Sequence, residues 1–463
     1  MTTNLTSGQN VFTFPNDFIF GAATASYQTE GAVSEDDRGV SIWDTFCSQP
    51  GKVYRGDDGN IACDSYHRYN EDLDILKSLN LNGYRFSISW PRILPEGTGV
   101  INQKGIDYYN RIIDGLLERN ILPAATIYHW DLPQLLQDKG GWANRDTAEY
   151  LADYAAICAD AFGDRVERFI TINEPQIVAR LGYRIGVHAP GIADPLQGRI
   201  ATHHILLAHG LATQAIKASQ NSTKPVGITI DLTDVVVLDE NAQDEAIQID
   251  REINGLYLDP VLLGTYPDIK RKEMLPPESV IMNGDMEIIS TNIDFLGVNY
   301  YQPHIVRTAS ETGIKFNEFP YDNHSNIVAV RPQDMPVTAM GWLVDPTGLD
   351  RILDKVHQMT NLPIYITENG CAVNDYVDPN GNVHDNERIS YLQGHLAACW
   401  RAIENGINLK GYYHWSLLDN FEWAEGYSKR FGLVYVDFST GKRTLKDSAL
   451  YYAKTAQMKS LKI

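Results

Sequence analysis

The sequence lacks long apolar runs and an excess of basic residues. None of its apolar runs approaches the roughly 20 residues that a membrane-spanning helix needs, so we expect no membrane partner. Its first residues show no basic segment followed by an apolar one, and we therefore expect no signal peptide. Lysine and arginine number 39 against 59 aspartate and glutamate residues, which gives a formal net charge of −20 at pH 7. This acidity argues against nucleic acid or an anionic membrane as a partner and suits a neutral ligand.

Cysteine is scarce, and no two cysteines have metal-site spacing. The five are odd in number, scattered, and never arranged as C-x-x-C: Cys47, Cys63, Cys158, Cys371 and Cys399. This usage indicates reduced thiols in a cytoplasmic protein, and neither a disulfide framework nor a zinc site. His203, His204 and His209 fall on one predicted helix, but they lie away from any strand end and have no carboxylate partner. We therefore expect no metal site, and nothing in the sequence requires a cofactor.

The sequence does contain a regular alternation of strands and helices, with no low-complexity linker, charge block or short repeat to divide it. Apolar runs predict eight strands, at residues 18–22, 83–89, 122–128, 169–174, 226–231, 295–299, 364–368 and 411–415. Helical spacing of apolar residues predicts helices at 65–79, 105–118, 147–162, 203–218, 244–258, 348–359, 385–405 and 446–458. Residues 302–346 are irregular, polar and dotted with proline, and a loop of this length is usually functional.

This alternation predicts an α/β protein, a (β/α)₈ TIM barrel. We expect residues 1–463 to form a single domain, with long loops around the active site. A doubly wound open sheet is the alternative. That fold would need a glycine-rich phosphate turn after the first strand, but residues 21–24 read Gly-Ala-Ala-Thr and do not match G-x-G-x-x-G.

Two glutamates stand at the ends of predicted strands. Glu368 ends one strand just before an Asn-Gly turn, and Glu174 ends another just before a proline. Taken alone, each could simply cap its strand and face water. Other polar and aromatic residues stand at strand ends as well: Arg85, His129, Asn173, Asn299, Tyr301 and Trp415. Because the C-terminal strand ends of a barrel share one face, we expect these residues to converge on one pocket.

The converging side chains suit a ring that carries many hydroxyl groups. Amides and carboxylates form hydrogen bonds with hydroxyls, and indole rings stack on C–H faces. The sequence contains neither a lysine clamp nor a P-loop, the features that would indicate phosphate transfer. Hydrolysis of a glycoside by two paired carboxylates is the chemistry that uses such a lining.

Nine short motifs follow one another along the chain: FGAATA at 20–25, QTEG at 28–31, YRFSISW at 84–90, TIYHWDLP at 126–133, NEP at 173–175, GVNYY at 297–301, MGW at 340–342, TENG at 367–370 and WSLLDNFEW at 415–423. Through these motifs the chain resembles, along essentially its whole length, the family 1 glycoside hydrolases, the β-glucosidases and their relatives. Each motif alone is moderately specific, whereas all of them in this order are very specific.

The resemblance implies a retaining mechanism in which Glu174 is the general acid/base and Glu368 is the nucleophile. The residues expected to support the nucleophile are Arg85, Tyr301 and Asn299. The residues expected to bind the sugar are Gln28, His129, Trp130, Asn173, Glu422, Trp423 and Phe431, with Trp415 as the stacking face. The implied substrate is a β-glucoside or a short β-linked oligosaccharide, and β-galactosides and β-fucosides are also expected. Whether the chain forms a homo-oligomer stays open.

One departure from the family pattern bears on specificity. Many relatives carry tryptophan directly after the Asn-Glu-Pro motif, where it lines the part of the cleft that holds the leaving group, the aglycone. This chain has Gln176 there. With Trp342 and the 302–346 loop as further walls, Gln176 predicts a preference for oligosaccharides such as cellobiose over bulky aryl glucosides.

Two alternative functions were weighed against this resemblance. The 6-phospho-β-glycosidases share the scaffold, but they have serine at the position of Glu422 and hold the phosphate with a nearby lysine and tyrosine. Lys429 matches that lysine, whereas Glu422 and Phe431 do not match, and a carboxylate at 422 would repel phosphate. A non-catalytic carbohydrate-binding relative usually lacks one catalytic carboxylate, and both are present here. Neither alternative is favoured.

Overall fold

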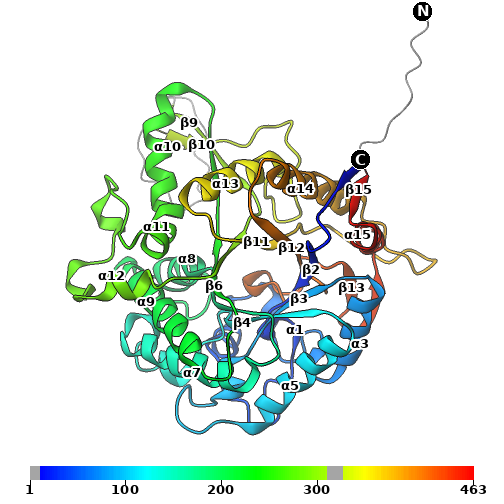
Figure 1. Cartoon of the computed structure of the whole chain (residues 1–463), viewed down its shortest axis with the longest axis horizontal. Helices are drawn as coiled ribbons and strands as arrows, with labels where there is room; N and C mark the ends of the chain where they lie inside the picture. Colours follow the sequence, from blue (N-terminus) through cyan, green and yellow to red (C-terminus); the bar gives the residue numbers. More distant parts are fainter. Residues whose placement is uncertain (1–10, 310–326, 463) are drawn as a thin grey trace, which may run out of the picture.

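Eight parallel strands close into a barrel in a computed structural model that describes residues 11–309 and 327–462 (Figure 1). Around the barrel, the strand order is β11-β12-β2-β3-β4-β5-β6-β8. The strands are β2 Ile19–Ala23, β3 Gly83–Ser87, β4 Leu122–Tyr128, β5 Arg168–Asn173, β6 Val226–Asp231, β8 Phe295–Asn299, β11 Ile364–Asn369 and β12 Leu409–Trp415. The predicted (β/α)₈ barrel is confirmed, and every predicted barrel strand is found in its place.

Helices surround the barrel (Figure 1). The longer ones are α3 Ser65–Ser78, α5 Gln103–Glu118, α7 Asp146–Phe162, α9 Pro195–Ala218, α10 Gln243–Asp250, α11 Leu256–Leu263, α13 Pro346–Met359, α14 Asn386–Glu404 and α15 Asp447–Met458. Short helices in the connections are α1 Ser26–Thr29, α2 Ile42–Cys47, α4 Trp90–Ile93, α6 Gln134–Gln137, α8 Pro175–Ile177 and α12 Asp285–Ile289. In α5, Ile106, Tyr109, Ile113 and Leu116 are buried at helical spacing, so one face of the helix packs inward. No helix in the described ranges is both long enough and apolar enough to cross a bilayer.

Two predicted helices differ from the observed ones. Helix α9 begins at Pro195, eight residues before the predicted start at 203. Asp194 caps it by accepting hydrogen bonds from the backbone N–H groups of Leu196 and Gln197, and proline suits the first helical position. The helix predicted at 244–258 is α10 followed by a π-helical turn, Arg251–Gly255, and then by α11, which continues to residue 263.

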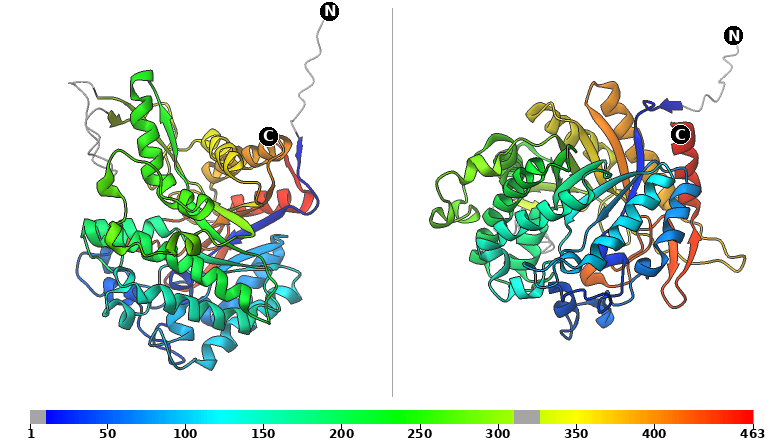
Figure 2. Two further views of the ribbon diagram at one scale, coloured as in Figure 1. Left: turned by 60° about the vertical axis from the view of Figure 1, so that its left-hand side comes forward. Right: turned by 60° about the horizontal axis from the view of Figure 1, so that its bottom comes forward.

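A small second sheet lies outside the barrel. Its order is β10-β9-β7, with β7 Asp234–Val237, β9 Pro303–Thr308 and β10 Ile327–Ala329, and α10 stands beside it (Figure 2). The prediction that residues 302–346 are irregular is therefore wrong for β9 and β10. Strand β9 pairs with the distant β7 and β10 pairs with β9, and this pairing stabilises short strands whose sequence signal is weak. Residues 310–326 of that predicted loop lie outside the described part of the chain.

Two further antiparallel strand pairs lie outside the barrel, and one of them joins the first and the last described strands. Strand β1 Val11–Thr13 pairs antiparallel with β15 Ser460–Lys462, so the first and last described residues lie side by side (Figure 2). Strands β13 Val434–Asp437 and β14 Lys442–Leu445 also pair antiparallel, directly before α15. The barrel strands themselves are buried almost throughout, which leaves their C-terminal ends and the loops beyond them to form a site.

Candidate active site

A cavity of about 1000 Å³ lies at the C-terminal ends of the barrel strands. Both strand-end glutamates, Glu174 and Glu368, line it. Other residues predicted for the site also line it: His129, Trp130, Tyr301, Trp342, Trp415, Glu422, Trp423 and Phe431. The barrel thus brings together residues that are far apart in the sequence.

Glu368 lies near the C-terminal end of β11 and is almost fully buried. Nη1 of Arg85 lies 2.5 Å from its Oε1, and the hydroxyl of Tyr301 donates a hydrogen bond of 2.7 Å to its Oε2. Each carboxylate oxygen therefore has a partner of its own. A buried carboxylate is tolerated when it is paired and hydrogen-bonded in this way.

Arg85 is held rigidly by the strands around it. From β3 its Nε donates to Oγ1 of Thr126 at 3.1 Å, its Nη1 to the Thr367 carbonyl at 3.1 Å, and its Nη2 to Oδ1 of Asn173 at 2.6 Å. Its side chain is 1% exposed. With its planar fork bonded to neighbours on three other strands, the guanidinium presents a fixed positive charge to Glu368.

Glu174 follows β5 directly and has a different set of neighbours. Its backbone has a φ of 49°, in the left-handed region that non-glycine residues seldom adopt and that is often found at functional sites. Its backbone N–H donates to the Thr229 carbonyl at 2.9 Å. Nδ2 of Asn299 donates to its Oε1 at 2.7 Å. The side-chain amide of Asn299 therefore contacts the other carboxylate, while its backbone lies opposite Glu368 between β8 and β11, and its support of Glu368 stays a prediction.

The surroundings of Glu174 favour its protonated form. Burial, followed by the negative charges of Glu368 and Asp231, raises the pKa of Glu174 well above its usual value. The hydrogen bond from Asn299 and the charge of Arg85 lower that pKa and have smaller effects. A carboxyl group that keeps its proton in a closed site is able to act as a general acid.

Two polar residues have spare hydrogen-bonding capacity: His129, which lines the cavity after β4, and Gln28, a buried residue after β2 that does not itself line the cavity. Nε2 of His129 lies 3.0 Å from Nδ2 of Asn173, so His129 accepts there and carries its proton on Nδ1. Burial and the nearby Arg85 lower the pKa of His129 well below its usual value, which keeps the ring neutral. Among the described residues, His129 Nδ1 and Gln28 Oε1 are buried without a hydrogen-bond partner. A donor and an acceptor of this kind suit a ligand hydroxyl group.

Glu422 is a third carboxylate in the cavity wall. Nε2 of Gln28 lies 3.5 Å from its Oε2 and also donates to the Phe421 carbonyl at 2.8 Å. Burial and the charge of Glu368 raise the pKa of Glu422 to about 8, against hydrogen bonds from Trp415 and Gln28 that lower it. With its pKa raised to this range, the Glu422 carboxyl group can hold a proton and can both donate to and accept from a hydroxyl group.

Aromatic rings line the same side. The rings of Trp130 and Trp423 lie 4.6 Å apart, and the ring of His129 lies 5.7 Å from that of Trp415 at an interplanar angle of 24°. Trp130 and Trp423 both have left-handed φ values, 81° and 49°. The indole N–H of Trp130 donates to the Asn173 carbonyl at 2.9 Å. Trp130 therefore shapes the cavity with its ring, and the prediction that it bonds a sugar hydroxyl is not supported.

Gln176 does not lie where the sequence predicted. It is buried, its Nε2 donates to the Asp231 carbonyl at 2.5 Å, and it lines a separate cavity of about 40 Å³ instead of the main one. The prediction that Gln176 faces the aglycone is wrong, because position 176 lies in the short helix α8 and points back toward β6. Trp342 does line the main cavity, with its ring 5.2 Å from that of Tyr301 and 5.9 Å from that of Phe431.

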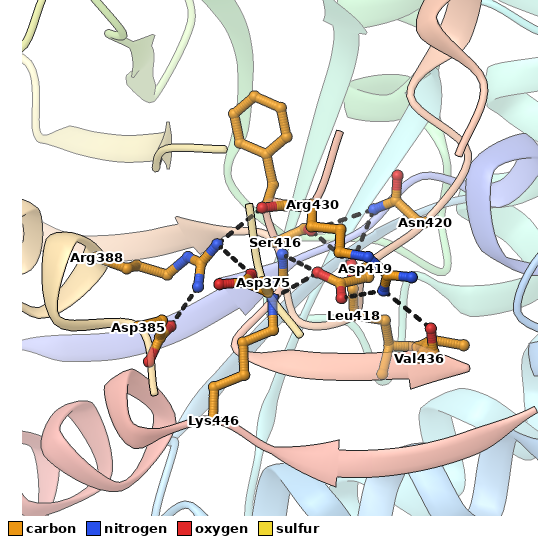
Figure 3. A network of polar contacts seen from close by, with 12 residues as sticks. Asp375, Asp385, Arg388, Ser416, Leu418, Asp419, Asn420, Arg430, Val436 and Lys446 are labelled. Atoms are coloured by element: carbon orange, nitrogen blue, oxygen red, sulfur yellow. Dashed lines mark hydrogen bonds and ion pairs between the residues drawn. The ribbon is translucent and has the colours of Figure 1, made fainter. Parts of the chain in front are cut away.

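The loop between β12 and β13, which carries Glu422, Trp423 and Phe431, is anchored by buried ion pairs (Figure 3). Nζ of Lys446 lies 2.5 Å from Asp375 and 2.6 Å from Asp419. Arg388 bonds Asp375 at 2.9 Å and also pairs with Asp385, while Arg430 bonds Asp419 at 2.7 Å. These bonds join the loop to the segment after β11 and to the start of α15. They fix the backbone that presents the sugar-side residues.

Asp231 and Arg180 also line the cavity, and the sequence prediction missed both. Asp231 ends β6, and burial raises its pKa to about 7, with the charge of Arg180 lowering it and that of Glu368 raising it further. The strand-end rule that singled out Glu174 and Glu368 applies equally to Asp231. Arg180 gave no such signal, because it lies in the π-helical segment Val178–Ile185 that follows α8.

The three clustered histidines take part in other contacts, and the expectation that they have no carboxylate partner is wrong for His203. His203 bonds Asp285 and the Tyr266 hydroxyl, both at 2.8 Å, while His204 and His209 contact the Trp142 carbonyl and Thr171. In the described ranges, no group of three or more histidine, cysteine, aspartate or glutamate residues is arranged to hold a metal ion.

The chain is similar to known proteins in both sequence and fold. The sequence model described as Glycosyl hydrolase family 1 matches residues 10–461. Beta-glucosidase A of Thermotoga maritima is 47% identical over 459 residues, which cover 98% of this chain and 99% of that protein. A bifunctional beta-D-glucosidase/beta-D-fucosidase of Bifidobacterium breve is 43% identical over 459 residues, which cover 95% of this chain and 97% of that protein.

The solved structures agree. The family 1 β-glucosidase of Thermotoga maritima in complex with isofagomine lactam is 46% identical, with a TM-score of 0.90 over 98% of this chain and 100% of that one. The same enzyme in complex with deoxynojirimycin has a TM-score of 0.89 over 97% of this chain and 99% of that one, again at 46% identity. Likeness of this extent, carried by a barrel with two buried glutamates at its strand ends, establishes the family. The chain belongs to glycosyl hydrolase family 1.

Proposed function

We propose that the protein is a retaining β-glucosidase that releases terminal, non-reducing β-glucosyl residues from short oligosaccharides or glucosides, and that it also acts on β-galactosides and β-fucosides. One observation carries the proposal. Two buried glutamates line one cavity, and one is paired with arginine while the other has neighbours that raise its pKa. Such a division suits a nucleophile and a proton donor. The names of the relatives, beta-glucosidase and beta-D-fucosidase, support the substrate class.

In the first step, Glu368 attacks the anomeric carbon while Glu174 donates its proton to the departing oxygen. The bond from carbon to the leaving group breaks as the bond to the Glu368 carboxylate forms, and the leaving group departs as a neutral alcohol. Arg85 and Tyr301 hold Glu368 in position through one oxygen each. Asn173 is our candidate for the sugar 2-hydroxyl, because its amide lies between Arg85 and His129.

In the second step, water displaces the sugar from Glu368. Once Glu368 is esterified, its negative charge is gone, and one cause of the raised pKa of Glu174 disappears with it. Glu174, now ionised, accepts a proton from the attacking water. Gln28, His129, Glu422 and Trp423 are proposed to hold the other hydroxyls of the sugar, with Trp415 and Phe431 as apolar faces.

The test has three readouts. The purified protein should release glucose from cellobiose and from 4-nitrophenyl β-glucoside, and the first anomer formed should be β-glucose by NMR. A 2-deoxy-2-fluoroglucosyl fluoride should label the peptide that contains Glu368, as detected by mass spectrometry. An initial product of α-glucose, a label on another residue, or equal rates for wild type and Glu368→Ala would overturn the proposal.

The geometry around Lys429 bears on the phosphorylated-substrate alternative. Its Nζ donates to the Ala339 carbonyl at 2.8 Å and lies 3.9 Å from Glu425. The positions that hold serine and tyrosine in that subclass are Glu422 and Phe431 here, so the 6-phospho-β-glycosidase alternative is not favoured. Both catalytic glutamates are present, so a binding-only role is not favoured either.

We further propose a cytoplasmic enzyme that works in cellobiose degradation, with residues 1–463 as one catalytic domain. All five cysteines are free and buried, which suits a reducing compartment. Size-exclusion chromatography with light scattering would determine whether the chain forms a homo-oligomer.

A further inference from the structure

Asn369 follows Glu368 directly and is the last residue of β11. Its side chain is fully buried and does not line the main cavity, so it has no access to a bound substrate. Any effect of Asn369 on the reaction must therefore pass through the residues that it contacts.

The strand pairing of β11 is irregular where the strand delivers Glu368. Register shifts interrupt its pairing with β8 between Ile366 and Glu368, and its pairing with β12 between Ile366 and Asn369. An irregularity of this kind re-aims a side chain, but it also disrupts the ladder of backbone hydrogen bonds. The end of β11 therefore depends on other contacts for its exact position.

The side-chain amide of Asn369 supplies such contacts. Its Nδ2 donates to the Tyr300 carbonyl at 2.6 Å and to the Tyr391 hydroxyl at 2.9 Å. Its Oδ1 accepts a hydrogen bond of 2.8 Å from the Tyr412 hydroxyl. The orientation of the amide follows from these partners, because a carbonyl oxygen can only accept. The side chain thus ties the end of β11 to the segment after β8, to α14 and to β12.

The hydrogen bond to the Tyr300 carbonyl lies beside Tyr301, which holds the nucleophile. That carbonyl belongs to the peptide group that leads into Tyr301, and the Tyr301 hydroxyl donates to Oε2 of Glu368 at 2.7 Å. The Tyr300 N–H also donates to the Glu368 carbonyl at 3.2 Å. Asn369 is therefore next to Glu368 in the chain and bonded to the backbone next to Tyr301.

We propose that Asn369 is a positioning residue for the nucleophile, because it fixes both ends of the Tyr301–Glu368 hydrogen bond. The inference rests on the proposed function, in which Glu368 attacks the anomeric carbon. A misplacement of about 1 Å in a reacting group can cost roughly 10²-fold in rate. A residue that acts only on this placement changes the rate of attack and leaves the binding of the sugar unaltered.

The experiment measures inactivation by 2-deoxy-2-fluoroglucosyl fluoride, because this reagent isolates the attack of Glu368. For Asn369→Ala, the inactivation rate at saturation should fall about tenfold or more, while the half-saturating concentration should change less than about threefold. Tyr412→Phe keeps Asn369 and removes one of its partners, so it should slow inactivation by a smaller factor, roughly twofold to fivefold. This second variant decides the matter where Asn369→Ala does not fold.

Combination with Tyr301→Phe gives a readout that a purely structural role would not move. Since Asn369 is proposed to act through the Tyr301 hydroxyl, its loss should matter little once that hydroxyl is gone. Asn369→Ala added to Tyr301→Phe should slow inactivation less than about threefold further. Losses that simply multiply, in this combination and in that of Tyr412→Phe with Tyr301→Phe, would overturn the inference.

Asn82→Ala is the matched control. The Asn82 side chain also bonds the backbone of a neighbouring segment, at the Phe20 N–H (2.8 Å) and the Phe18 carbonyl (3.3 Å). It stands directly before β3, at the opposite end of the barrel strands, and does not line the main cavity. Both asparagine variants should lower the melting temperature, and only Asn369→Ala should slow inactivation. Equal kinetic losses in the two would overturn the inference.

The same reagent separates this inference from the proposed function. Unchanged inactivation in Asn369→Ala and Tyr412→Phe, with the wild-type protein labelled on Glu368, overturns the role of Asn369 and leaves the proposed function intact. A wild-type protein labelled on another residue, or not labelled at all, overturns the proposed function and the inference together.

Discussion

Glu174 and Glu368 are the same residue type in one cavity, and their surroundings differ at every contact. Glu368 has a guanidinium group on one oxygen and a phenol on the other. Glu174 has a neutral amide on one oxygen and two carboxyl groups close enough to raise its pKa. The surroundings of the two glutamates therefore assign their chemical roles, since the side chains alone could exchange them.

The different surroundings of the two glutamates arise from two consecutive residues at the end of β5, Asn173 and Glu174. Asn173 is the last residue of the strand, and its side chain accepts a hydrogen bond from Arg85. Glu174 comes next, and its left-handed backbone turns it away from the regular strand toward Asn299. Arg85 can therefore bond Asn173 and Glu368 together, while Glu174 receives only a weaker long-range effect from the same charge.

Removing Glu368 should have the largest effect on the difference between the two glutamates. Glu368→Ala should lower kcat by at least about 10⁴-fold, because no covalent intermediate can form. Added azide should restore turnover of a dinitrophenyl β-glucoside by occupying the space of the lost carboxylate. Attack from that side in a single displacement gives the α-glucosyl azide, which NMR identifies. A β-glucosyl azide would show that Glu368 isn't the nucleophile.

The reciprocal change is Glu174→Ala, which removes the proton donor and keeps the nucleophile. Hydrolysis of cellobiose should fall about 10²- to 10⁴-fold, since its departing hydroxyl group needs a proton. A dinitrophenyl leaving group does not, so the first step with that substrate should stay near the wild-type rate and the glycosyl-enzyme should accumulate. Azide should now give the β-glucosyl azide. Equal loss on both substrates would contradict the assignment of Glu174.

A smaller change tests how Glu368 is held. Tyr301→Phe removes the hydrogen bond to Oε2 and should lower kcat/KM about 10- to 100-fold, because a bond to a charged group contributes about 1.5–3 kcal/mol. Tyr300→Phe is the matched control. Its hydroxyl donates to the Asp345 carbonyl at 2.8 Å, so its removal should lower the melting temperature and leave kcat/KM within about twofold. Equal kinetic losses in the two variants would mean that the Tyr301 hydroxyl has no special role.

The barrel and the meeting of its strand ends could be predicted because both follow from local patterns. Buried parallel strands are short apolar runs, and strand β4 was predicted at its observed bounds, 122–128. Closure of the barrel then places every C-terminal strand end on one face, whatever the distance in sequence. Arg85, Glu174 and Glu368 needed no further information to be brought into one site.

Side-chain direction could not be predicted in the same way. Asn299 and Trp130 belong to matching segments and Gln176 directly follows one, yet each has its polar group turned to a partner other than the predicted one. These partners come from neighbouring strands or from the backbone of residue 173, and the outcome depends on tertiary packing. Asp231 was missed for a different reason: it has the strand-end signal but lies in none of the motifs that carry the family resemblance.

The smallest expected effect concerns Asp231, whose charge is one cause of the raised pKa of Glu174. The alkaline limb of kcat/KM against pH reports loss of the proton from Glu174 in the free enzyme. Burial raises the pKa of Asp231 to about 7, so its negative charge forms as the pH rises and helps Glu174 to keep its proton. Asp231→Asn removes that charge and should therefore move the alkaline limb to lower pH. Asp234→Asn is the control, since Asp234 pairs with Arg351 outside the cavity and should leave the limb in place. A limb that stays fixed in Asp231→Asn would mean that Glu368 and burial alone keep Glu174 protonated.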